Sequence, residues 1–267
     1  MGSASLNPQG GLRRGEEVSK RGSLIPKKLK FDAIIEALLE MRFSTTTQSE
    51  FLFVRLAEHP SWKGFSQARL PAYGIPENIR QIDQNLRFQP TFELLEPSKQ
   101  RAVRIGPSVI SYHLRKPYVG WPEFSQELRG MVDRLFESAE GLTVSRLGLR
   151  YINAFSPSLH GIRGIGDLDL SITVAGAPVE SNVNVNFSSQ AFPQTNAAVR
   201  IASPEFFVAL PEIEATALAD IDIFTREGFE ATNRKSIYDW LELAHAAKNE
   251  EFFCLLAPET ISSLEAV

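Results

Sequence analysis

Two aspartates in the stretch "ADIDIF", Asp220 and Asp222, have a type and spacing that could do chemistry. Side chains alternate between the two faces of a β-strand, so both carboxylates would lie on one face and the neighbouring isoleucines on the other. Paired carboxylates can hold Mg²⁺ or Ca²⁺, or act as general acid and base. A metal-dependent hydrolase or nuclease centred on these aspartates is one hypothesis. Two solvated aspartates on an outer strand face are the structural alternative.

The stretch "SRLGLRYINAF", residues 145–155, also alternates as a strand does. One face carries Arg146 and Arg150, and the other carries a mainly apolar set that should face a core: Leu147, Leu149, Tyr151, Asn153 and Phe155. If both strands share a sheet, the two arginines would pair with the two aspartates across an exposed face. The binding residues predicted on this sheet are Arg146, Arg150, Asn153, Asp220 and Asp222.

Trp121, in "KPYVGWPEF", lies just before the start of a predicted helix. In one interpretation it is an apolar anchor that holds the helix on the sheet. In the other it is a pocket wall beside a helix N-terminus, which attracts anions. Both interpretations stay open, and Trp121 is the sixth predicted binding residue.

Motifs that would specify catalysis are missing from the sequence. It has no nucleophile elbow, Walker loop, H-E-x-x-H or paired C-x-x-C. Glu242 and His245 have the Glu-x-x-His spacing of carboxylate metal bundles, but such bundles need that motif twice. We therefore expect no cofactor and no metal.

The elements that must position these residues follow from periodicity. Helices are predicted at 47–59, 120–141 and 236–256, where apolar residues recur at three and four positions. A hairpin is predicted around Gly106-Pro107. Residues 31–45 are ambiguous, with a strand favoured at the end, and the second half holds the predicted strands 168–176, 181–189, 196–203 and 216–225.

Hairpins combined with separate long helices are typical of an α+β fold. We expect a largely antiparallel sheet with the long amphipathic helices packed on one face. A single domain would span residues 30–260. Paired strands followed by one long helix occur twice, so two similar halves, 30–160 and 165–260, are also considered.

Charge divides the chain into a basic leader and an acidic body. The net charge is −4, but residues 1–29 and Lys30 together hold seven Lys/Arg and two acids. Residues 1–29 lack apolar periodicity, so we expect them to be disordered. An acidic body is unsuited to duplex DNA, which leaves the leader as the only nucleic-acid contact to consider. The single cysteine and the absence of a long apolar run predict a cytoplasmic protein without a membrane span.

The segments "YVGWPEF", "LGLRYIN" and "LADIDIF", with a last helix holding His245 and Phe252-Phe253, resemble a sporadically distributed family of uncharacterised bacterial proteins. The resemblance covers roughly residues 30–260. That family has no established activity, so the resemblance implies no substrate. Its patchy occurrence resembles that of accessory proteins of mobile or defence-linked systems. We therefore predict a non-catalytic binding protein whose partner is another protein, with the metal-dependent enzyme as the alternative.

Overall fold

The structure is a computed structural model that describes residues 26, 29–207 and 214–265. The predicted disordered leader lies outside the described residues, except for Pro26 and Leu29. Leu29 forms an antiparallel bridge with Glu265 and packs against the core. The folded domain therefore includes this residue, and its last helix runs to Leu264.

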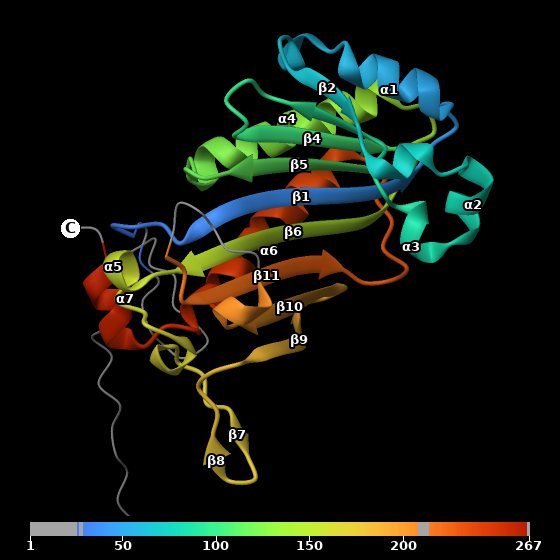
Figure 1. Cartoon of the computed structure of the whole chain (residues 1–267). Coiled ribbons are helices and arrows are strands. Elements are labelled where there is room, and N and C mark those ends of the chain that lie inside the picture. Colours follow the sequence, from blue (N-terminus) through green and yellow to red (C-terminus); the bar gives the residue numbers. More distant parts are fainter. Residues whose placement is uncertain (1–25, 27–28, 208–213, 266–267) are drawn as a thin grey trace, which may run out of the picture.

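One nine-stranded sheet organises the chain, and every neighbouring pair of its strands is antiparallel (Figure 1). In their order across the sheet, the strands are β2 (Ser66–Arg69), β3 (Phe92–Leu95), β4 (Arg101–Gly106), β5 (Val109–Arg115), β1 (Ile34–Ser44), β6 (Thr143–Phe155), β11 (Ala217–Thr225), β10 (Thr195–Ala202) and β9 (Asn184–Phe192). A separate hairpin pairs β7 (Thr173–Val174) with β8 (Ala177–Pro178). The α+β prediction with a largely antiparallel sheet is confirmed.

The two long helices, α4 and α6, cover one face of this sheet and leave the other face open (Figure 1). The helices are α1 (Ser49–Ala57), α2 (Glu77–Ile82), α3 (Gln84–Arg87), α4 (Trp121–Ser138), α5 (Pro157–His160), α6 (Arg234–Phe253) and α7 (Pro258–Leu264). The apolar stripe of α4, from Phe124 to Leu135, is fully buried against the sheet. No helix in the described ranges is long and apolar enough to cross a membrane.

The element order repeats along the chain. A central strand, a later three-stranded meander and one long helix occur first as β1, β3–β5 and α4, and then as β6, β9–β11 and α6. In this order β6 begins the second unit, whereas the halves predicted from the sequence, 30–160 and 165–260, put this strand at the end of the first half. A duplication stays a prediction.

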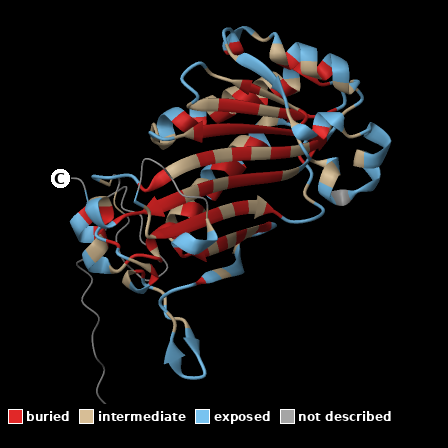
Figure 2. Ribbon diagram, in the orientation of Figure 1, coloured by how far each residue is buried: buried red, intermediate tan, exposed pale blue. Residues whose placement is uncertain are grey.

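Residues 168–176, predicted as one strand, do not form one. Only Thr173–Val174 is strand, at the start of the exposed β7–β8 hairpin (Figure 2). The alternating apolar residues before it pack against the main core: Leu168, Leu170 and Ile172. The ambiguous segment 31–45 is resolved in favour of strand β1.

Candidate functional site

The open side of the sheet brings together the charged residues that the sequence singled out. Residues directly opposite in an antiparallel pair share a face, and Arg150 lies opposite Asp222. Arg150 donates from Nε to Oδ1 of Asp220 at 2.7 Å and from a second guanidinium nitrogen to Oδ2. Arg146 donates to Oε1 of Glu40 at 2.9 Å and lies 3.5 Å from Oδ2 of Asp222. The predicted pairing across the two strands is confirmed, and we call these five residues the charged face.

The charged face is less exposed than the sequence predicted. Asp220 is 8% exposed. The side chains of Arg146 and Asp222 are 24% and 27% exposed. Neighbouring strands bring long charged side chains close enough to cover one another, which an alternation pattern does not reveal. Burial raises the pKa of Asp222, although Arg146 and Arg150 oppose that shift.

This geometry does not favour metal binding by Asp220 and Asp222. Both oxygens of Asp220 already accept from Arg150. Oδ1 of Asp222 is buried without a hydrogen-bond partner in the described structure, so one acceptor is left. Within the described ranges, no group of three or more His, Cys, Asp or Glu side chains is arranged to hold a metal ion.

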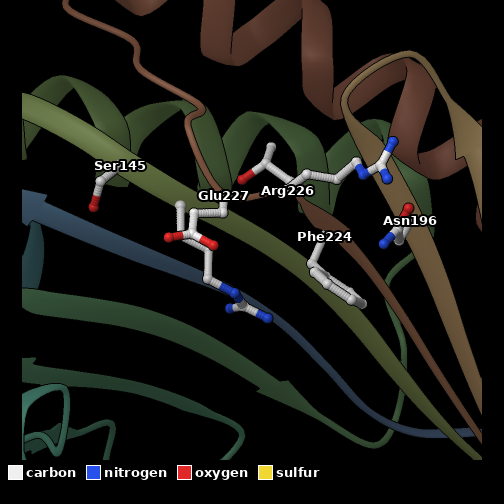
Figure 3. Close-up of a pocket in the computed structure, with 7 residues that line it drawn as sticks. Ser145, Asn196, Phe224, Arg226 and Glu227 are labelled. Atoms are coloured by element: carbon white, nitrogen blue, oxygen red, sulfur yellow. The ribbon is translucent and has the colours of Figure 1, made fainter. Parts of the chain in front are cut away.

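A hollow of about 360 Å³ adjoins the charged face at Arg146 (Figure 3). Phe224 and Asn196 line it from β11 and β10, and Arg226 and Glu227 line it from the loop that follows β11. The half-buried charge in its lining, Arg146, is already paired with two carboxylates. Arg146 therefore offers a ligand in this hollow no unpaired charge.

A Ser–His–Glu chain on β5 and β1 was not predicted from the sequence. His113 lies 2.9 Å from Oγ of Ser111 through Nε2 and 2.9 Å from Oε1 of Glu36 through Nδ1. These distances match those of a nucleophile, its base and the group that orients the base. Ser111 and His113 are only 6% and 5% exposed, so the hydroxyl is not presented to a substrate. The chain is a buried hydrogen-bond network between two strands.

A second cavity, of about 530 Å³, lies where the N-terminus of α4 meets the C-terminal half of α6. Two predicted binding residues line it, Trp121 and Asn153. Its other side chains include Asp32, Tyr118, His245, Lys248, Asn249 and Phe252. We call it the Trp121–Lys248 cavity.

Lys248 is the most unusual group in this cavity, because it is only 6% exposed. Within the described residues its side-chain ammonium makes no hydrogen bond and no ion pair. Its Nζ lies 4.3 Å from the ring centroid of Tyr151 and 5.9 Å from that of Phe252. Burial lowers the pKa of Lys248 to about 8, although the Asp32 carboxylate opposes the shift. The ammonium is held by aromatic faces, which attract cations weakly.

Trp121 is both an anchor and a wall, so each of its two interpretations captures part of its role. Its Nε1 donates to Oε2 of Glu242 at 3.0 Å, and Arg129 holds the other oxygen of that carboxylate. Its ring stacks in parallel on His245 with centroids 4.0 Å apart, and it packs against the core. The Glu-x-x-His spacing on α6 therefore fixes the indole.

His245 contributes an unused hydrogen-bond donor. Burial lowers its pKa to about 3, so the ring is neutral. Asn249 Nδ2 can only donate, and it lies 3.2 Å from Nε2 of His245, so the ring proton is on Nδ1. That Nδ1 is buried and has no partner in the described structure.

Asn153 and Tyr118 complete the wall where β6 ends. Asn153 is 1% exposed and donates to the carbonyl of Ala219 on β11 at 3.0 Å, so it joins two strands. The hydroxyl of Tyr118 lies 3.3 Å from that of Tyr151, and burial raises the pKa of both phenols. Both hydroxyls are therefore neutral at physiological pH.

Replacing Trp121 by alanine should lower the free energy of unfolding by about 2–3 kcal/mol. Replacing a fully buried aromatic ring by alanine costs about 3–5 kcal/mol. The cost is smaller here because Trp121 is only half-buried. Trp121→Phe is the matched control, because it keeps an aromatic ring but loses the hydrogen bond to Glu242. It should lower the free energy of unfolding by about 1 kcal/mol. Urea unfolding measures both. A neutral alanine variant would show that the ring does not anchor α4.

No family model matches the chain, and no curated protein matches it. Among solved structures, it is similar to the duplicated taurocyamine kinase from Schistosoma mansoni with bound transition state analog components. The TM-score is 0.44 at 10% identity, with 84% of this chain and 34% of that chain covered. The chain thus spans about a third of that protein's length, and so distant a likeness carries no argument about function.

Proposed function

We propose that this protein is a binding protein for a small anionic molecule, which it holds in the Trp121–Lys248 cavity. The observation that carries the proposal is the burial of the Lys248 ammonium without an ion pair among the described residues. Burying an unpaired charge costs several kcal/mol, so buried charges in proteins are normally paired. A ligand anion would supply the missing partner.

Two further features that favour an anion belong to the same cavity. The cavity includes Gly120 and Trp121, where the 18-residue helix α4 begins. No side chain caps this end, and the first-turn carboxylate of Glu123 is paired with Arg101, so the helix end can still attract a ligand anion. The unpartnered Nδ1–H of His245 adds a donor.

The apolar part of the lining indicates what the rest of the ligand is like. Trp121, Tyr118, Phe252 and Phe253 surround the polar groups. Rings with a few convergent polar groups are typical of sites for small organic ligands. An aromatic or otherwise planar carboxylate satisfies both parts of the cavity.

Benzoate and benzamide test this proposal, because they have nearly the same shape and only benzoate is charged. Benzoate should raise the melting temperature of the wild type by several degrees, and benzamide should not. Lys248→Met should abolish the benzoate shift. Lys235→Met is the matched control, since Lys235 is an exposed lysine on the same helix. Equal shifts with both compounds, or a benzoate shift retained in Lys248→Met, would contradict the proposal.

The wider role stays a proposal as well. We propose that the protein acts in the cytoplasm and that another protein responds to its ligand state, as expected of an accessory protein. The alternative, a metal-dependent enzyme, is supported only by the oxygen Oδ1 of Asp222, which has no hydrogen-bond partner in the described structure. Mg²⁺ that raised the melting temperature of the wild type and not of Asp222→Asn would favour that alternative.

A further inference from the structure

We propose that Lys248 forms an imine with the bound ligand, and that the ligand is therefore a carbonyl compound with an adjacent carboxylate, a 2-oxo acid. This inference rests on the proposed function, since it concerns the same cavity. It adds a covalent step that simple anion binding does not need.

The surroundings of Nζ suit an amine that reacts. An ion pair with a carboxylate would hold the amine protonated and unreactive, and Lys248 has no such pair among the described residues. Burial favours the neutral amine, as in lysines that form Schiff bases. Lys30 also lines the cavity but is exposed, so it lacks this environment.

The donors in the cavity suit the ligand's carboxylate. The His245 Nδ1–H and the open N-terminus of α4 can bind it while the carbonyl carbon faces Nζ. The protonated imine keeps the positive charge of the lysine. The carboxylate therefore remains paired after the reaction.

The reaction balances without an oxidant or reductant. The neutral Nζ bonds to the carbonyl carbon, the C=O π pair moves to oxygen, and a proton passes from nitrogen to that oxygen. The C–O bond of this carbinolamine then breaks, the nitrogen lone pair forms C=N, and the oxygen leaves with a second proton as water. The second proton comes from solvent, and Asp32, which lines the cavity and interacts with Lys248, is placed to relay it.

Borohydride trapping tests the imine. The full chain is incubated with phenylglyoxylate and then reduced with sodium borohydride, which converts an imine into a stable secondary amine. Intact mass and peptide mapping should show one adduct, on Lys248. Mandelate, which has a hydroxyl in place of the carbonyl, should give none, and Lys30→Met should be labelled as well as the wild type.

The outcomes separate this inference from the proposed function. If phenylglyoxylate raises the melting temperature through Lys248 but leaves no adduct there after reduction, the imine is overturned and anion binding stands. If labelling is spread equally over exposed lysines such as Lys235, the imine is also overturned. If the compound neither shifts the melting temperature nor labels Lys248, both proposals fail.

Discussion

Raising the pH from about 7 to about 10 should stabilise the wild-type protein relative to Lys248→Met by about 2.5 kcal/mol. The pKa of Lys248 is lowered from 10.5 to about 8 in the folded protein. Below pH 8 the lysine is protonated in both states, and the folded state carries the full cost of the buried charge. Between about pH 8 and 10.5 the folded state has lost a proton that the unfolded state still binds, so stability rises with pH.

Urea unfolding at a series of pH values measures this difference. Lys248→Met has no such proton, so its curve should lack the rise, and it should be more stable than the wild type at pH 7 because methionine suits an apolar site. Tyrosines with raised pKa destabilise both proteins alike above about pH 10, and the comparison cancels their effect. Lys235→Met should follow the wild type. Parallel curves for wild type and Lys248→Met would mean that the lysine is solvated.

Arg150→Ala should lower the free energy of unfolding by about 2 kcal/mol. The change leaves Asp220, which is only 8% exposed, without its two hydrogen bonds and its counter-charge. Breaking a fully buried pair costs about 3–5 kcal/mol. The Arg150 side chain is 42% exposed, so water screens part of this cost.

The double variant Arg150→Ala with Asp220→Asn identifies the cause. It also removes the negative charge of Asp220, which Arg150→Ala leaves unpaired, so it should recover part of the stability that Arg150→Ala loses. Arg163→Ala, which breaks an exposed pair with Asp167, should leave stability unchanged. A neutral Arg150→Ala would show that Asp220 is hydrated and that the charged face is an ordinary exterior.

The pairing on the charged face could be predicted because strand alternation is local. The period of two places Arg146 and Arg150 on one face and Asp220 and Asp222 on one face. Opposite charges on two apolar-backed strands then indicate a shared sheet. How deeply that face is buried depends on which strands flank it, and that is a property of the whole sheet.

Lys248 was missed although the sequence carries a signal for it. It lies on the apolar stripe of α6 at a spacing of four residues with Trp240, Ala244 and Phe252, all of which are buried. A lysine is normally read as a solvated residue. Its position within the stripe was the indication that it is buried.

Other parts were missed because their pattern is weak. Strand β2 is fully exposed and α2 has no buried residue, so neither shows an apolar periodicity. The cavity itself joins residues more than 200 positions apart, from Asp32 to Phe253. Only the tertiary arrangement brings them together.

The most direct measurement is a crystal structure of the protein soaked with 4-iodobenzoate, whose iodine is located by anomalous scattering. The proposed function predicts iodine density inside the Trp121–Lys248 cavity, with the carboxylate within hydrogen-bond distance of Nζ of Lys248. The soak uses a 4-iodobenzoate concentration that raises the melting temperature of the protein. An empty cavity, or iodine bound only elsewhere, would contradict the proposed function.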